Sequence, residues 1–329
     1  MASYKHLTIG QRERLYLARN KGESMAMIAA GLGVSKSTVS RELKRNGGLK
    51  DYSPSSAQKS YGTRRSGCHP RRILDDVAMH GYVSEKFLCQ QWSPEEIASR
   101  IKHEGNIGGI STSTIYRAIY RGDFDRDAGR LCGVRAAVRK LRHRGKKRHK
   151  KGTDELRGKI KISHDISERG DGAKDCSEAG HWEADTVLGK SGGACLVTLV
   201  DRRSRYAMLS KAGSKTADAV NRILKARLSA TILKSVTPDR GKEFAFHAKV
   251  TEELGVQFYF PPPHHPWERG TNENTNGLIR EYLPKGKSMD DVTDAYIESI
   301  EKKINLRPRK CLGYKTPYEL FYGKELHLA

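Results

Sequence analysis

The sequence has no long apolar run and is comparatively poor in hydrophobic residues. These make up 36% of its 329 residues. The longest apolar stretches, such as residues 194–200, have only the length of a strand, so we expect no membrane-spanning helix. The first residues, MASYKHLTIGQRERL, lack the apolar core of a secretory signal. The six cysteines form no C-x-x-C pair, which disfavours a zinc finger and favours reduced thiols.

Acidic residues are few compared with basic ones. The chain has 61 Lys and Arg against 38 Asp and Glu, a net charge of +23 with histidine neutral. Residues 1–150 carry 31 basic and 13 acidic side chains, a balance of +18, whereas residues 151–329 carry 30 and 25, a balance of +5. The first half therefore indicates binding to a polyanion, while the second half keeps many carboxylates on a basic protein.

Residues 25–45 have the pattern of a helix–turn–helix. A first helix is predicted over 25–32, Gly33 supplies the turn, and Ser35 caps a second helix. The exposed face of the second helix combines short hydroxyl side chains, which reach base edges, with Lys and Arg, which bind guanine or phosphate. The predicted DNA contacts on this face are Ser35, Lys36, Ser37, Thr38, Ser40, Arg41, Lys44 and Arg45.

Residues 93–120 repeat this pattern less closely. Ser93 and Pro94 form a capped helix start, a glycine-rich turn follows at 105–109, and a second helix is expected over 111–120. The predicted DNA contacts are Thr112, Ser113, Thr114, Tyr116 and Arg117. A simple helical packing unit is the alternative for both segments.

Two basic stretches separate the predicted domains. Residues 51–82 contain Pro54 and Pro70 and are expected to form an extended basic linker. Residues 126–175 form a second linker, in which nine of the thirteen residues 139–151 are Lys or Arg and are predicted to contact phosphate. The domains are then a first helix–turn–helix over 1–50, a second over 83–125, and a catalytic domain over 176–329.

The C-terminal half alternates strands and helices. Strands over 181–188, 194–201 and 205–209 are separated by turn signals, as in antiparallel hairpins. The order helix–strand–helix–strand–helix follows, up to residue 283. This order predicts an α/β domain with helices on both faces of one sheet.

Three carboxylates stand at positions suited to chemistry. Asp185 lies in the first of these strands, Asp239 follows an apolar strand, and Glu273 lies in the first turns of the last helix. Taken singly, each is more often a capping, ion-paired or exposed residue. Together they could converge only around a cation, and Mg²⁺ prefers such oxygen ligands. Two Mg²⁺ ions per site, with Mn²⁺ as a substitute, would activate a water or a 3′-hydroxyl and stabilise the leaving oxygen of a phosphodiester.

Three sequence blocks resemble a known family. These are GHWEAD (180–185), DRGKEF (239–244) and PWERGTNENTNGLIREYLPKG (266–286). They are similar to blocks of the DDE transposases of bacterial insertion sequences, in particular the IS-thirty (IS30) family. The tail NLRPRKCLGYKTPYELF and the N-terminal helix–turn–helix also resemble that family, so the resemblance covers nearly the whole chain.

The resemblance implies a multidomain fold, with all-α helix–turn–helix modules and an α/β RNase H-like, retroviral integrase-like catalytic domain. It implies that Asp185, Asp239 and Glu273 are the catalytic metal ligands, and the 33 residues between the last two fit the family pattern. The implied function is a transposase that binds terminal inverted repeats and catalyses 3′-end cleavage and strand transfer into target DNA. A homodimer or larger synaptic assembly in the bacterial cytoplasm, at the nucleoid and without a membrane, is expected.

Further DNA contacts are predicted around Glu273. They are Arg240, Arg269, Asn272, Asn276 and Arg280, with Arg307, Arg309 and Lys310 in the tail as contacts or as solvated loop residues. Arg240 stands where the family usually has Asn. Glu183 is expected to bond within the sheet, and Glu243 to interact with a helix macrodipole. The alternative functions are a DNA-binding regulator, or an integrase or nuclease that does not mobilise its own element.

Overall fold

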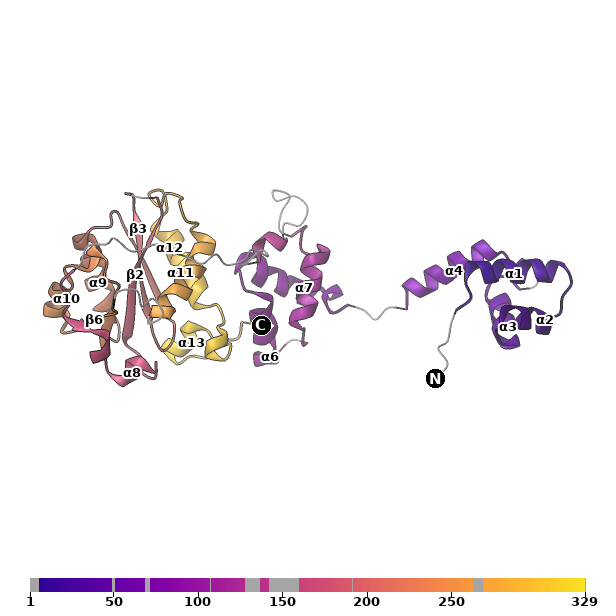
Figure 1. Ribbon diagram of the computed structural model, residues 1–329, viewed down its shortest axis with the longest axis horizontal. Helices are drawn as coiled ribbons and strands as arrows, with labels where there is room; N and C mark the ends of the chain where they lie inside the picture. Colours follow the sequence, from indigo (N-terminus) through magenta and orange to yellow (C-terminus); the bar gives the residue numbers. More distant parts are fainter. Residues whose placement is uncertain are drawn as a thin grey trace. The chain divides into compact units, whose positions relative to one another are not determined.

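The computed structural model describes residues 6–48, 51–68, 72–106, 108–127, 137–141, 160–190, 192–262 and 269–328. The chain divides into two compact units, Met1–Asp75 and Asp76–Ala329, which are described separately below (Figure 1). Within the described residues, no helix has the length and apolar character needed to cross a membrane.

The N-terminal unit is a small helical bundle with a helix–turn–helix. Its helices are α1 (Ile9–Asn20), α2 (Met25–Leu32), α3 (Lys36–Arg45) and α4 (Pro54–Ser66). The turn after α2 uses Gly33 at φ 65°, a left-handed conformation that favours glycine. The Ser35 side chain caps α3 by accepting from the backbone N–H of Thr38. Leu15, Ile28 and Val39 meet in the core, so the predicted helix–turn–helix is confirmed.

Helix α4 replaces much of the linker predicted over 51–82. Pro54 occupies the first turn, where its missing N–H costs no hydrogen bond. Tyr52 and Ala57 are buried in the core with α1 to α3, and this packing stabilises a segment with little apolar periodicity of its own. The predicted linker also contains a short 3₁₀ turn, Ile73–Asp75, and most of α5 (Val77–Ser84).

The second unit begins with a helical segment. After α5 come a π-helical turn, η2 (Glu85–Cys89), and the helices α6 (Pro94–Glu104) and α7 (Thr112–Arg121). Ser93 and Glu96 form a capping box at the start of α6, as the sequence predicts. Gly105 ends α6 at φ 68°, and Ser111 caps α7. This segment belongs to the same compact unit as the sheet.

A mixed six-stranded sheet, in the order β1-β6-β5-β2-β3-β4, forms the centre of the second unit. The strands are β1 (His164–Asp165), β2 (His181–Leu188), β3 (Cys195–Asp201), β4 (Ala207–Ala212), β5 (Ser235–Thr237) and β6 (Gln257–Phe260). Strands β2, β3 and β4 pair antiparallel, and β5 and β6 run parallel to β2. The predicted strand order along the chain is confirmed.

Helices cover both faces of this sheet (Figure 1). They are α8 (Asp171–Lys174), α9 (Ala217–Leu228), α10 (His247–Leu254), α11 (Gly270–Tyr282), α12 (Asp294–Asn305) and α13 (Pro317–Tyr322). Alternate residues of β3 face opposite sides: Val197 packs in the core with α9 and α10, and Leu196 in the core with α11 and α12. The buried sheet thereby fixes the side of β2 that faces α11.

The second predicted linker, 126–175, also contains structure. Strand β1 pairs parallel with β6, with His164 opposite Tyr259, so the sheet begins before residue 176. Residues 137–141 include the 3₁₀ turn Ala137–Lys140. Most of the basic stretch 139–151 lies outside the described residues.

Candidate active site

Strands β2 and β5 place two of the predicted carboxylates side by side. The strands pair in parallel, with Glu183 opposite Thr237. Asp185 lies two residues beyond this pair on β2, and Asp239 lies two residues beyond it after β5 ends. Parallel strands carry such residues to the same edge of the sheet. The predicted meeting of Asp185 and Asp239 follows directly from this register.

Arg269 links the two carboxylates. Its Nη2 lies 3.2 Å from Oδ2 of Asp185, and its Nη1 lies 4.0 Å from Oδ2 of Asp239. Nη2 also donates to the carbonyl oxygen of Ala184 at 2.9 Å. Since the three side chains are only 13–22% exposed, the guanidinium neutralises negative charge in a largely desolvated place.

The electrostatics of Asp239 reflect this crowding. Burial raises the pKa of Asp239 to about 6, and the negative charge of Asp185 adds to the rise, against the opposing effect of Arg269. Two oxygen-donating carboxylates with this mutual repulsion fit a hard divalent cation, which would stabilise both in their charged form. The donor chemistry therefore suits Mg²⁺ or Mn²⁺.

Glu273 is not gathered into this pair. Its side chain is exposed in the first turn of α11. Among the described residues, no group of three or more His, Cys, Asp or Glu side chains has the arrangement of a metal site. One helical turn further on, Nδ2 of Asn276 donates to Oδ2 of Asp185 at 3.0 Å. Of the predicted three-carboxylate cluster, the structure brings together the two aspartates, with Arg269 beside both and Asn276 bonded to Asp185.

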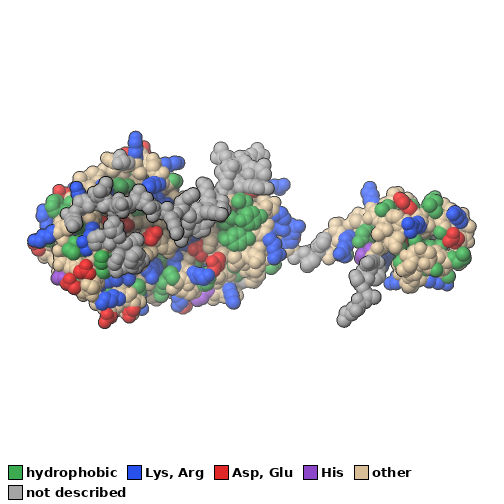
Figure 2. All heavy atoms as spheres, viewed as in Figure 1, with side chains coloured by type: hydrophobic (Ala, Val, Ile, Leu, Met, Phe, Trp, Pro, Cys, Tyr) green, Lys and Arg blue, Asp and Glu red, His purple; other side chains and the backbone are tan. Residues whose placement is uncertain are grey.

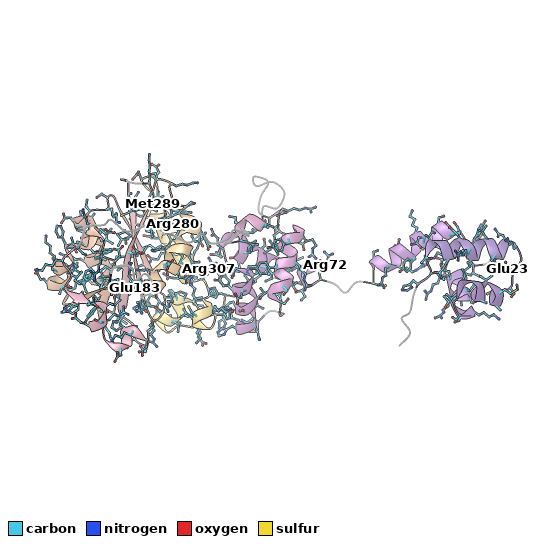
Figure 3. All side chains as sticks on the ribbon, in the orientation of Figure 1. Glu23, Arg72, Glu183, Arg280, Met289 and Arg307 are labelled. Carbon is cyan, nitrogen blue, oxygen red and sulfur yellow. The ribbon has the colours of Figure 1, made fainter. Side chains whose placement is uncertain are left out.

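Glu183 anchors α11 to the sheet, a role that differs from the hydrogen bond within the sheet expected for it. Its side chain is fully buried, and Oε2 accepts from the backbone N–H of Asn272 at 2.9 Å. Oε1 forms an ion pair with Arg202. Figure 3 labels Glu183 in the sheet and Arg280 on α11. The hydrogen bond to Asn272 fixes the first turn of the helix that carries Glu273. In the sequence, the only signal for this role of Glu183 is its position two residues before Asp185 on the same strand.

Glu243 performs a similar task on the other face of β2. It is buried in the short 3₁₀ helix η6 (Lys242–Phe244), and its Oε1 accepts from Thr186 Oγ1 at 2.8 Å and from Lys215 Nζ at 2.7 Å. Glu243 lies in the first turn of η6, as predicted, and its side chain also bonds to the residue after Asp185. Glu243 thereby connects the segment that follows Asp239 to the strand that carries Asp185.

The predicted DNA contacts around Glu273 largely serve the protein itself. Arg240 donates from Nε to the carbonyl oxygen of Pro261 at 2.6 Å, and Arg280 from Nη1 to that of Leu283 at 3.4 Å. Asn272 is 1% exposed, which corrects its prediction as a DNA contact. Arg269 and Asn276 bind Asp185 instead of facing solvent. The sequence identified these residues as a group but could not show that they face inward.

The tail residues are corrected as well. Arg307 is buried and pairs with Glu96 at 3.0 Å and Glu281 at 2.8 Å. Lys310 pairs with Glu95 at 2.7 Å, and the buried Arg309 donates to the carbonyl oxygen of Ile304 at 3.2 Å. Burial thus corrects the phosphate contacts predicted for Arg307 and Arg309, and Arg307 holds α6 to the C-terminal segment. The Lys310 side chain is 74% exposed, as expected for a solvated loop residue.

Most of the DNA contacts predicted on α3 and α7 are exposed. On α3, Thr38 is half-buried, and the other predicted contacts are exposed: Ser35, Lys36, Ser37, Ser40, Arg41, Lys44 and Arg45. On α7, Ser113, Tyr116 and Arg117 are exposed, whereas Thr112 and Thr114 are half-buried. Figure 2 shows Lys and Arg side chains on the visible face of both units.

Comparison with known proteins agrees with this architecture. Residues 3–46 match the helix-turn-helix domain family, and residues 177–266 match the integrase core domain family. The transposase for insertion sequence element IS4351 of Bacteroides fragilis is 38% identical over 322 residues, 96% of this chain and 95% of that protein. Transposase InsI for insertion sequence element IS30A of Escherichia coli K12 is 36% identical over 96% of this chain and 83% of that protein. The catalytic core domain of BIV integrase, 17% identical, covers 44% of this chain and 95% of its own with a TM-score of 0.36.

A helix–turn–helix joined to an integrase core defines the class of DNA-binding transposases and integrases. The sequence identity that extends over nearly the whole chain is to insertion-sequence transposases within this class. The chain belongs to the IS30 family of insertion-sequence transposases. The fold class predicted from the sequence is confirmed.

Proposed function

We propose that this transposase binds the terminal inverted repeats of its own insertion sequence, cleaves the 3′ ends, and joins them to target DNA by two-metal chemistry. The observation that carries the proposal is the meeting of Asp185 and Asp239 at adjoining strand ends, with the pKa of Asp239 raised by burial and by its neighbour's charge. A divalent cation is the natural partner of such a pair.

Asp185, Asp239 and Glu273 are the proposed ligands of two Mg²⁺ ions. When bound, the ions would supply an activated water or 3′-hydroxyl and stabilise the leaving oxygen. Asp185 and Asp239 are held ready by the sheet. Glu273 lies three residues before Asn276 on the same helical face, and Asn276 bonds to Asp185, so Glu273 is the proposed third ligand on this side of α11. Glu183 holds the start of α11, which carries Glu273, against the sheet.

The exposed face of α3 is the proposed reader of the terminal repeat, and α7 is a second DNA-binding helix. Cleavage and joining involve two ends of the element, so we propose a homodimer or a larger assembly as the active form. Target DNA would enter at the same carboxylates after cleavage.

The test separates chemistry from binding. Asp185→Asn should abolish Mg²⁺-dependent cleavage and strand transfer on a duplex taken from the flank of the chain's own gene, while the duplex is still bound. Asp171→Asn, which changes an aspartate whose side chain is 96% exposed, is the matched control and should cleave like the parent. Cleavage retained by Asp185→Asn would contradict the assignment. Footprints confined to random positions on the flanks would contradict repeat recognition.

A further inference from the structure

Helices α3 and α4 enclose a hollow in the N-terminal unit. Arg41 and Arg45 line it from α3, and Arg64, Arg65 and Cys68 line it from the end of α4 and the residues just beyond. Arg41 and Arg45 are four residues apart on one face of α3, and Cys68 follows Arg64 by four residues and Arg65 by three. The hollow has a volume of about 380 Å³, and Figure 1 shows both helices in this unit.

The hollow is strongly cationic. All four arginines are exposed. Among the lining residues that the structure describes, Glu42 is the only carboxylate; it is 9% exposed, and its Oε1 accepts from Nε of the buried Arg12 at 2.6 Å. Glu42 is therefore paired with Arg12 inside the bundle. Among the described residues that line the hollow, no other carboxylate faces the four exposed arginines.

The other contacts of these arginines involve neutral groups. Arg41 donates to the backbone oxygen of Ser37 at 3.1 Å, and Arg64 donates to Oδ1 of Asn46 at 3.4 Å. Such bonds orient a guanidinium but do not neutralise it. An exposed, oriented guanidinium matches the geometry of a phosphate group, which accepts two parallel N–H bonds.

The position of α4 agrees with this chemistry. In helix–turn–helix proteins the recognition helix lies in the major groove, and neighbouring elements contact the sugar–phosphate backbone. Helix α4 packs on α1 and faces the basic side of α3 across the hollow. Its arginines therefore lie beside the groove-reading surface and not on it.

We infer that α4 is a phosphate clamp: Arg64 and Arg65 bind backbone phosphates of the DNA strand that borders the major groove read by α3. The inference rests on the proposed DNA binding by this unit. It adds a contact beyond residues 3–46, the helix–turn–helix match, and it assigns α4 to affinity, with sequence reading left to α3.

The test compares two double variants of the full-length chain on two duplexes, one from the flank of its own gene and one of mixed sequence. Arg64→Ala/Arg65→Ala should weaken binding to both by the same factor, roughly tenfold or more. The slope of log affinity against log salt concentration should flatten by about 2, since about 0.9 is lost per phosphate contact. Lys21→Ala/Lys59→Ala removes two exposed cations of the same unit that do not line the hollow, and should change the slope much less.

Three other outcomes would contradict the phosphate clamp or the proposed function. Equal flattening by both double variants would mean that only overall charge matters and would overturn the clamp. A loss confined to the flank duplex would make Arg64 and Arg65 base contacts and would also overturn it. A parent chain that binds neither duplex would overturn the proposed function itself.

Cys68 allows an independent test, because this exposed thiol lines the same hollow. A mixed-sequence duplex with a disulfide-activated tether on one backbone phosphate should react with Cys68 by thiol–disulfide exchange: the thiolate of Cys68 breaks the tether's disulfide, forms a new disulfide to the tether, and releases the activating group as a thiol. Cys68→Ser should lose the cross-link, whereas Cys311→Ser, which changes an exposed thiol of the second unit, should keep it. Cross-linking that survives Cys68→Ser unchanged would place the backbone elsewhere.

Discussion

Nη2 of Arg269 lies 3.2 Å from Oδ2 of Asp185, so a positive side chain holds the place at which a catalytic cation is proposed. On the proposed assignment, the guanidinium and a metal ion would compete for the same negative charge. Arg269→Gln should lower the free energy of unfolding in EDTA by about 1–2 kcal/mol, because Asp185 and Asp239 then repel each other without compensation. Adding Mg²⁺ should raise the melting temperature of this variant more than that of the parent. Equal Mg²⁺ shifts in both proteins would contradict the competition.

The raised pKa of Asp239 predicts a pH dependence of stability. The folded state holds this proton up to a pKa of about 6, whereas an unfolded aspartate titrates near 3.9. The resulting stabilisation is fully present below about pH 4 and is lost as the pH rises through 6, on the order of 2–3 kcal/mol in all. Asp239→Asn removes the ionisation, so its stability relative to the parent should increase over this range. Urea denaturation in EDTA from pH 4 to 7 measures the difference, and a constant difference would refute the assignment.

Gly241 has no side chain, and the carboxylates of Asp239 and Glu243 occupy the space beside its Cα. A Cβ atom added there would lie 2.3 Å from Oε2 of Glu243 and 2.7 Å from Oδ1 of Asp239. Gly241→Ala should therefore displace both carboxylates and reduce Mg²⁺-dependent cleavage by at least about a hundredfold, the cost of a small misplacement at a reacting centre. Gly213→Ala, at a position with open space around the new Cβ, should cleave like the parent. Parent-like cleavage by both variants would mean that the site tolerates the displacement.

We expect the stability of the second unit to be sensitive to mutation of Arg100. Its side chain is fully buried, and both terminal nitrogens donate to Glu319 at 2.8 Å. Arg100→Ala leaves Glu319 buried without this partner and should cost about 3–5 kcal/mol of unfolding free energy. Lys102→Ala, which changes an exposed residue of the same helix, should stay within about 0.5 kcal/mol of the parent. Thermal denaturation measures both, and similar values for the two variants would refute the prediction.

Arg41 tests sequence reading by α3. Arg41→Ala should weaken binding to the flank duplex by about 1–3 kcal/mol if the guanidinium contacts a base. Binding to a mixed-sequence duplex should change little. An equal loss on both duplexes, measured by fluorescence anisotropy at one salt concentration, would reassign Arg41 to phosphate.

Local signals in the sequence predicted much of this fold. Ser35, Ser93 and Gly33 act on neighbours within a few residues, so capping and turn rules locate the helices they begin or end. The meeting of Asp185 and Asp239 was also predictable, since strand order carries both to one edge. The contact between Arg100 and Glu319 was not, because the two lie 219 positions apart in the sequence and only tertiary packing pairs them.

The same limit explains the predictions that were wrong. Arg307 and Asn272 are residue types that often contact DNA, and nothing nearby in the sequence shows that their side chains are buried. Helix α4 escaped prediction because its stability comes from Ala57 and Tyr52 against the bundle and not from its own periodicity. Long-range charge pairing and tertiary packing are thus the information that a single sequence lacks.

The bond between Arg100 and Glu319 also has a mechanical consequence. Glu319 lies on α13, whose Phe321 stacks on Tyr206 with ring centroids 4.4 Å apart, so α6 is fastened through α13 to the body that carries Asp185. Helix α7 packs on α6 and therefore belongs to the same compact unit as the strand that carries Asp185. DNA bound at the contacts proposed on α7 would then lie at a fixed distance from Asp185. The position of α7 would thereby determine where the bound strand is cut.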